Sequence, residues 1–231
     1  MAGRLSLVML ATLLIAVTPP TCPAAPAQEP MVARTVALPG PDLAGKSTLE
    51  SVLTRRRSVR AYLPGALSLG QVGQLLWAAQ GITSPDGKRT TPSARAVYPL
   101  EVYVVADGIA GLPAGVYCYE PKGHALGLVA PGNHSAALAA AAPRQDFVAR
   151  APLAIVVVGD SLLAAQQFGA HAERWMAMEA GFVVQDVYLQ ATALGLGTVM
   201  VGGFEEGALR RALLLPAGRV PLALMPVGRK K

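Results

Sequence analysis

The spacing of apolar residues predicts a well-marked amphipathic helix near residue 70. Five apolar residues recur there at three- and four-residue intervals: Leu69, Val72, Leu75, Leu76 and Ala79. Ser68 and Gln71 have the spacing of a capping box at the start of this helix, and Gly81 stands where a left-handed residue would end it. A second capping box, Ser47 with Glu50, predicts a short helix just before it in the chain.

Short apolar runs bounded by turn-forming residues predict a sheet. The expected strands cover residues 100–106, 115–119, 125–129, 153–158, 198–201 and 220–227. Further helices are expected at 136–142, 161–194 and 205–213. Within the second of these, residues 172–194 are apolar nearly all round, which exceeds what one core face requires. With no internal repeat and no second domain boundary, the sequence predicts one α+β domain.

The first 27 residues have the pattern of a secretory signal peptide. Arg4 gives a positive start, residues 5–17 form an apolar run, and Ala25–Ala27 supplies the small residues of a cleavage site. An uncleaved membrane anchor is the alternative, but about 13 apolar residues are fewer than a spanning helix needs. Cys22 is a further candidate, as a lipoprotein acceptor. We expect a signal peptide at 1–27, an irregular lead-in at 28–45, a domain at 46–231 and export to a bacterial periplasm without stable membrane insertion.

The composition of the chain excludes some classes of protein and indicates which kinds of partner it could bind. Of the 231 residues 52% are hydrophobic and 15% charged, which excludes a disordered or collagen-like chain. Lys and Arg number 20 against 14 Asp and Glu, a net charge of +6. Such an excess indicates nucleic acid, an anionic membrane or a phosphate-bearing ligand. Aromatic residues are only 5% and the signal peptide predicts export, so nucleic-acid binding is disfavoured.

The sequence lacks the motifs typical of several kinds of metal, nucleotide and catalytic site. His124, His134 and His171 are scattered without cysteines or carboxylates at ligand spacing, so we expect no metal site. Gly195–Gly197 follows a helix and precedes a strand, the reverse of a dinucleotide-binding turn. Cys118, the single cysteine after cleavage, alternates onto the face of Val116, which favours packing over reactivity. Neither a nucleophile elbow nor a phosphate-binding loop is present.

A cluster of cations is the strongest candidate for binding chemistry. Arg55, Arg56, Arg57 and Arg60 surround Ser58. The cluster is compatible with a solvated helix end, but guanidinium groups also bind phosphate in a bidentate manner, and a hydroxyl between them adds a neutral donor.

Five segments in order resemble the FMN-dependent nitroreductase family. Arg56–Arg60 resembles its Arg-x-Ser-x-Arg signature, and residues 92–103 are similar to a segment of its thiazole/oxazole-forming peptide dehydrogenase (SagB/ThcOx-type) branch. The other matching segments are 179–191, 194–198 and 200–204, followed by Pro226–Gly228 near the end. Together they span about residues 51–228, essentially the whole predicted domain.

The resemblance implies a nitroreductase-like α+β fold with a central, mostly antiparallel sheet flanked by helices. It also implies an intertwined homodimer with FMN bound between subunits. The residues implied to hold the phosphate, ribityl chain and pyrimidine edge of FMN are Arg56, Ser58 and Arg60, with Arg57 close by. Those implied to line the flavin ring are Ser93, Ala94, Arg95, Met200, Val201, Gly202 and Gly203. Arg229 or Lys231 could reach the phosphate from the C-terminus.

The implied function is an exported FMN-dependent oxidoreductase that transfers hydride through flavin N5 between a reduced donor and a small-molecule acceptor, or dehydrogenates a substrate. NAD(P)H is the candidate electron donor, and no catalytic side chain is assigned. The alternative is a non-catalytic periplasmic module that binds a flavin or another small ligand on the same fold. Arg95 stands in place of a common glycine, Phe182 of a histidine and Asp186 of an asparagine, which leaves the substrate open.

Overall fold

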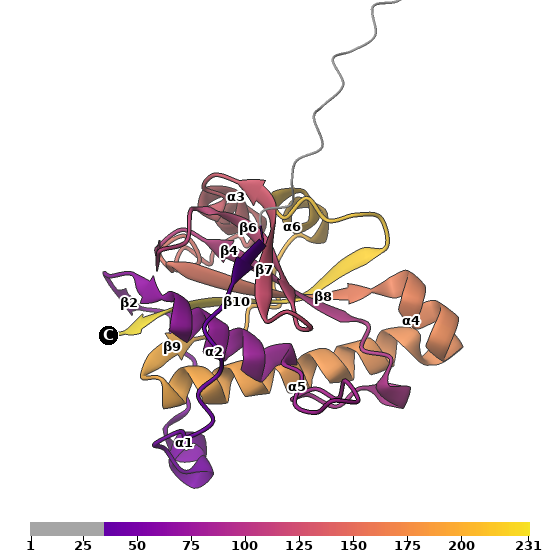
Figure 1. Ribbon diagram of the computed structural model, residues 1–231. Coiled ribbons are helices and arrows are strands. Elements are labelled where there is room, and N and C mark those ends of the chain that lie inside the picture. The colour runs from indigo at the N-terminus through magenta and orange to yellow at the C-terminus, as the bar shows by residue number, and fades with distance from the viewer. Residues whose placement is uncertain (1–34) are drawn as a thin grey trace, which may run out of the picture. The chain divides into compact units, whose positions relative to one another are not determined.

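A computed structural model describes residues 35–231 (Figure 1). The predicted signal peptide at 1–27, including Cys22, lies outside the described residues, so export stays a prediction. The lead-in predicted at 28–45 is not wholly irregular, because Thr35–Ala37 forms a strand, β1, in its described part. This strand pairs with Ala125–Pro131 (β7) at the edge of the sheet.

One antiparallel sheet forms the centre of this part of the chain. Its strands are β1, β2 (Tyr62–Leu63), β4 (Leu100–Ala106), β6 (Gly115–Glu120), β7, β8 (Leu153–Asp160), β9 (Leu196–Thr198) and β10 (Arg219–Lys230). Their order is β1-β7-β6-β4-β8-β10-β2, with β9 pairing separately with β10. Two further strands, β3 (Leu67–Ser68) and β5 (Ile109–Ala110), form a small parallel pair. The predicted α+β fold with a central antiparallel sheet is confirmed.

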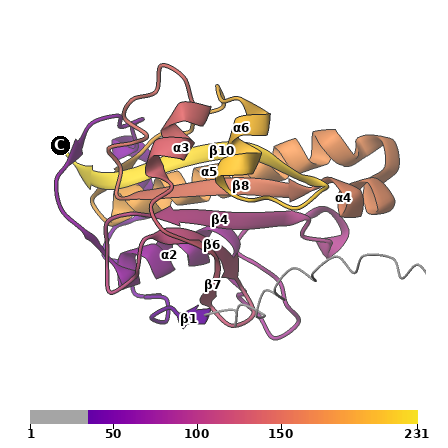
Figure 2. The same ribbon diagram turned by 90° about the horizontal axis from the view of Figure 1, so that it is seen from above.

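Helices cover both faces of the sheet. The helices are α1 (Leu49–Arg55), α2 (Leu69–Gln80), α3 (Ser135–Ala141), α4 (Ser161–Phe168), α5 (Ala172–Ala193) and α6 (Glu206–Ala212). Figures 1 and 2 show α2 and α5 against one face and α3 and α6 against the other. A sheet covered in this way buries apolar residues on both of its faces.

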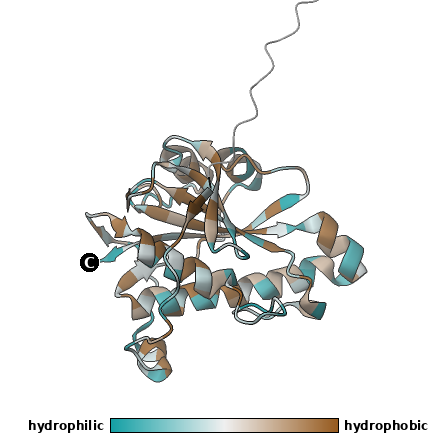
Figure 3. Ribbon diagram, viewed as in Figure 1, coloured by the Kyte–Doolittle hydropathy of each residue, from teal (hydrophilic) through white to brown (hydrophobic). Residues whose placement is uncertain are grey.

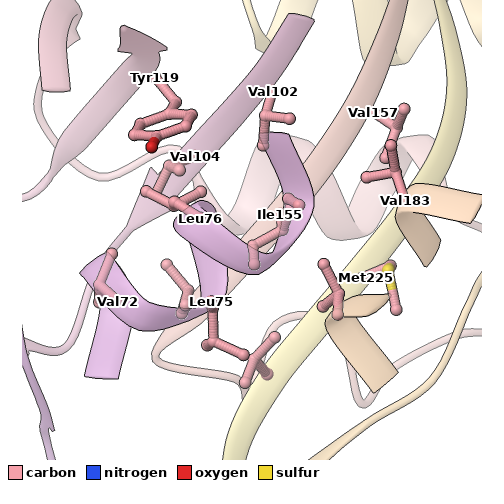
Figure 4. Packing of buried hydrophobic residues seen from close by; sticks show 14 of the residues in the cluster. Val72, Leu75, Leu76, Val102, Val104, Tyr119, Ile155, Val157, Val183 and Met225 are labelled. Carbon is pink, nitrogen blue, oxygen red and sulfur yellow. The ribbon is translucent and has the colours of Figure 1, made fainter. Parts of the chain in front are cut away.

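The side chains of β4 show how the two faces are filled. Val102 and Val104 belong to the hydrophobic cluster beneath α2 and α5, whereas Tyr103 and Val105 belong to the cluster beneath α3 and α6. This alternation is the two-residue period of a strand. Figure 4 shows the first cluster, in which Leu76 of α2 lies near the valines of β4. Burial of each such side chain contributes about 1.5–3 kcal/mol.

Hydropathy along the helices agrees with this layering. In Figure 3 the central strands are largely brown, while the helices carry both brown and teal segments. On α5, Val183 and Val187 are fully buried, but Met178 and Phe182 are 52% and 44% exposed. The apolar character of α5 beyond its buried face is therefore real, and it faces outward.

Some predicted boundaries are wrong by a residue or two. The first helix is capped by Thr48, whose hydroxyl accepts the N–H of Ser51, and not by Ser47 with Glu50. The strand predicted at 198–201 lies instead at Leu196–Thr198, where it pairs with the end of β10.

The glycine that ends α2 serves a different purpose from the one predicted. Ser68 and Gln71 do form the expected capping box. Gly81, however, has φ −63° and ψ 143°, which is extended and not left-handed. A Cβ at this position would collide with the side chain and carbonyl of Trp77, so close approach explains the glycine.

Cys118 fulfils its predicted packing role. It packs against the same cluster that contains Val116, and burial raises the pKa of its thiol to about 12. A thiol with so high a pKa is a poor nucleophile at neutral pH.

The arginine-rich segment lies along the short strand β9. The N–H of Val59 donates to the carbonyl of Thr198 at 2.9 Å, and Ser58 forms a parallel bridge with Thr198. Gly197 lies beneath this contact, and a Cβ added to it would lie 2.5 Å from Cγ1 of Val59. The absence of a side chain at 197 is therefore what lets the segment approach the sheet.

This contact predicts the effect of adding one methyl group. Gly197→Ala should lower the free energy of unfolding by about 1–3 kcal/mol, because the new Cβ overpacks against Val59. Urea denaturation measures the change. The double variant Gly197→Ala with Val59→Ala makes room for the Cβ and should regain part of the loss relative to the sum of the single variants. Strict additivity of the two substitutions would contradict this account.

Candidate functional site

Tyr188 on α5 joins two of the segments predicted to hold a cofactor. Its hydroxyl lies 3.2 Å from Oγ of Ser58 and accepts the backbone N–H of Met200 at 2.7 Å. The tyrosine is 8% exposed, and its position on the buried face of α5 directs the hydroxyl toward the end of β9. Residues more than a hundred positions apart are thereby held at one point.

Two arginines of the segment that carries Ser58 lie over aromatic rings. The guanidinium of Arg56 lies 5.2 Å from the ring centre of Tyr188, and that of Arg60 lies 6.0 Å from the ring of Phe147. Neither forms an ion pair within residues 35–231. The rings hold the cations by cation–π attraction and leave their N–H groups available to an anion.

Arg57 points elsewhere. Its Nη1 donates to the carbonyls of Thr54 and Arg56, at 3.0 and 2.7 Å. Together with Arg55 and Lys230 it lines a separate cavity of about 320 Å³. The alternation of an extended segment thus places Arg57 apart from Arg56, Ser58 and Arg60.

The predicted glycine turn lies open. Val201 is fixed by paired backbone hydrogen bonds with Leu224, at 2.8 and 3.1 Å. Gly202 and Gly203 follow and are exposed, and a Cβ at Gly203 would meet no atom within 4 Å. The backbone after Met200 is therefore accessible to a bound molecule.

The third predicted segment is anchored to another part of α5. The N–H of Ala94 donates to Oε1 of Glu179 at 2.8 Å, and Oγ of Ser93 accepts the N–H of Tyr98 at 2.9 Å. Arg95 donates to the carbonyl of Gln167 at 2.9 Å.

The backbone of this loop is strained. Arg95, Ala96 and Tyr98 have φ of 54°, 54° and 53°, a conformation that costs a residue with a side chain about 1–2 kcal/mol. Strain of this kind is concentrated at functional sites.

A single chain does not bring all the predicted residues together. Glu179 and Tyr188 are nine residues apart on α5, which corresponds to about 13 Å along the helix axis. The loop at Ala94 therefore lies away from Ser58 and Met200. The guanidinium of Arg229 lies against Gly65, where the end of β10 pairs with β2.

Comparison with known proteins identifies the family. The sequence profile of the Nitroreductase family matches residues 53–229. The chain belongs to this family. A curated relative from Methanocaldococcus jannaschii that carries a nitroreductase name is 42% identical over 182 residues, covering 79% of this chain and 91% of the relative.

Solved structures agree with this nitroreductase-family assignment. A protein of Ralstonia eutropha described as a nitroreductase has a TM-score of 0.77 at 31% identity, over 86% of this chain and 90% of that one. A chain of the Escherichia coli microcin synthetase McbBCD complex has a TM-score of 0.65 at 24% identity, over 78% of this chain and 73% of that one, and shares the fold. The chain is a nitroreductase-family oxidoreductase.

Two site residues of this nitroreductase-family chain were not singled out by the sequence. Tyr188 and Glu179 lie in the long helical segment that matches the family, and no local pattern assigns either of them a role. A glutamate at a buried position of an apolar helix face is the signal that could have revealed Glu179. No such signal exists for Tyr188, whose role depends on which segment docks against it.

The three histidines have structural partners. His124 contacts the hydroxyl of Tyr119 at 2.9 Å, and His134 contacts the carbonyl of Ala212 at 3.1 Å. His171 stacks on Trp175. Within residues 35–231 no group of three potential ligands could hold a metal ion, and no helix has the length and apolar character to span a membrane.

Asp186 is a half-buried carboxylate on α5. It lines a cavity of about 340 Å³ beside Leu49, Val52 and Trp77. Burial among these groups raises its pKa from 3.8 to about 6. The charged form is therefore disfavoured in the folded protein.

The raised pKa of Asp186 predicts a pH dependence of stability. The folded state binds the proton more tightly than the unfolded state, so the contribution of Asp186 is full below about pH 4 and is lost as the pH rises to about 6. Asp186→Asn should raise the free energy of unfolding at pH 7 by about 1 kcal/mol, since partial exposure screens the charge. Urea titrations at several pH values test this. A variant with the wild-type slope between pH 4 and 6 would refute it.

Proposed function

We propose that the protein is an FMN-dependent oxidoreductase. The observation that carries the proposal is the hydroxyl of Tyr188, which holds Ser58 and Met200 together beside the unpaired guanidinium groups of Arg56 and Arg60. Members of the nitroreductase family generally bind flavin and use NAD(P)H. The same chemistry is proposed here, with NAD(P)H or another reductant as the donor.

The residues present fit this cofactor. The phosphate of FMN is an anion, and Arg56 and Arg60 offer it charge-assisted hydrogen bonds that no carboxylate of the described residues takes up. The oxygen of Ser58 is already oriented by Tyr188. Gly202 and Gly203 leave their backbone N–H groups open to a planar ring.

The chain's own side chains act by binding and orientation. When bound, FMN supplies a ring that accepts hydride at N5 and passes it to an acceptor. Arg56 and Arg60 would hold the phosphate of FMN. A cation near the pyrimidine edge of the flavin ring would favour the anionic form of the reduced flavin. No side chain is proposed as nucleophile or general base.

We propose that two copies complete the site. Ser93, Ala94 and Arg95 lie about 13 Å along α5 from the Tyr188 contact, so one chain does not place them on the same ring. A second copy can supply them, and the exposed Met178 and Phe182, which line the cavity beside Ala94, would then lie at the edge of that contact. The cavity beside Ala94 would then face the flavin of the partner subunit.

The finer assignments rest on the sequence. Residues 92–103 support placement in the thiazole/oxazole-forming peptide dehydrogenase branch, and residues 1–27 support export to the periplasm. The natural acceptor is proposed to be a small molecule.

The purified protein should be yellow and should release FMN on denaturation. Arg56→Ala with Arg60→Ala should lower FMN affinity at least about a hundredfold, because two charge-assisted contacts are lost. Visible absorbance during FMN titration measures this, and circular dichroism checks the fold. The matched control is Lys122→Ala with Arg211→Ala, two exposed cations outside this segment and outside α5. Undiminished flavin binding in the first variant would overturn the phosphate assignment. A flavin-loaded protein that shows no turnover with any electron donor would favour the non-catalytic binding module.

The proposed dimer has its own test. Light scattering should give twice the mass of one chain for the flavin-loaded protein, since each flavin draws residues from two copies. A mass equal to that of one chain, together with full flavin occupancy, would contradict the shared site.

A further inference from the structure

Glu179 is a nearly buried carboxylate that the proposed flavin chemistry does not use. The residue is 5% exposed, and its Oε1 accepts the N–H of Ala94 at 2.8 Å. No Lys, Arg or His forms an ion pair with it in the part of the chain that the structure describes. A carboxylate removed from water without a counter-charge is costly, so a cation brought by a ligand would be strongly favoured there.

The second oxygen of Glu179 is available to such a ligand. Oε2 has no hydrogen-bond partner among residues 35–231. No fully buried side-chain oxygen in those residues lacks a partner, so Oε2 must retain an opening. Glu179 also lines a cavity of about 320 Å³, together with Ser93 and Ala94. One oxygen anchors the loop, and Oε2 is the oxygen left for a molecule in this cavity.

The walls of the cavity are apolar and aromatic. Trp175, Met178 and Phe182 project from α5 around Glu179 at three- and four-residue spacing. The ring of Trp175 is held by Phe168 at 5.2 Å and by His171, stacked at 5.1 Å. An aromatic wall fixed in this way loses little conformational entropy on binding a ligand.

An arginine near this cavity does not neutralise the carboxylate. Arg95 follows directly after Ala94, but its Nη1 donates to the carbonyl of Gln167 at 2.9 Å. The negative charge of Glu179 is thus left to whatever enters between the aromatic side chains.

We propose that this cavity binds the substrate by a cationic nitrogen, an ammonium group carried on an apolar or ring-bearing molecule. Oε2 of Glu179 accepts the N–H of the ammonium, the aromatic faces attract its charge, and Met178 covers the apolar part. The assignment of this ligand as substrate rests on the proposed function, because the cavity adjoins the loop proposed to line the flavin. The binding chemistry itself is independent of flavin.

Benzylammonium and benzyl alcohol provide a matched pair of probes, because they differ in charge and have almost the same shape. Trp77 and Trp175 are the two tryptophans of the chain, so Trp77→Phe leaves Trp175 as the fluorophore at the cavity. Quenching of its fluorescence should give at least about tenfold tighter binding of benzylammonium than of benzyl alcohol. Equal affinities would overturn the proposal without any further variant.

Glu179→Gln identifies the source of the preference. Glutamine can still accept the N–H of Ala94, so the loop stays anchored while the charge is lost, and the tenfold preference should disappear. Glu173→Gln, at an exposed carboxylate on the same helix, should keep it. Phe182→Ala should weaken both ligands, because it removes a shared wall. An unchanged preference in a folded Glu179→Gln would overturn the assignment.

The two proposals fail in different ways. A protein that prefers benzylammonium but binds no FMN would retain the cationic cavity and refute the flavin function. A yellow, FMN-binding protein without the preference would retain the flavin function and refute the cavity assignment.

Discussion

The arrangement of the site depends on the burial of α5 against the sheet. Val183 and Val187 fix one side of this helix in the core, and that constraint sets the positions of Tyr188 and Glu179. Tyr188 forms hydrogen bonds with the arginine-rich segment and with the residues after β9, whereas Glu179 accepts a hydrogen bond from the loop around Ala94. One rigid helix thus positions three loops, which is how a scaffold gives loop residues a defined geometry.

The sequence predicted the elements better than it predicted their contacts. The strand at 100–106 and the capping box at Ser68 follow from local patterns, and both are confirmed. The short strands β2 and β9 have too few residues to show a period, and their pairing with β10 depends on distant segments. Gly81 is a further example. Glycine is required there because a Cβ would collide with Trp77, and not because of a backbone angle, which a local pattern does not reveal.

The candidate site was predictable as separate segments but not as a geometry. The resemblance to the family pointed to Ser58 and Met200, yet only the fold reveals that the hydroxyl of Tyr188 links them. Arg57 illustrates the reverse case: its neighbours in sequence suggested a shared role, and the extended backbone turns it to another cavity. A run of like residues in an extended segment therefore divides between two surfaces.

The unpaired charges of the two proposed sites lie at different positions relative to α5. Arg56 lies over the ring of Tyr188, with Arg60 in the same segment, whereas Glu179 lies about two and a half turns away along the helix. A cation at Glu179 and an anionic phosphate at the arginines would each bind where the local potential favours its sign. If two copies share each flavin as proposed, the arginines of one copy and the carboxylate of its partner belong to the same composite site. Part of the basic excess of the chain, Arg56 and Arg60, then serves to bind phosphate. The charged group of the substrate is bound by Glu179 on α5 of the other subunit.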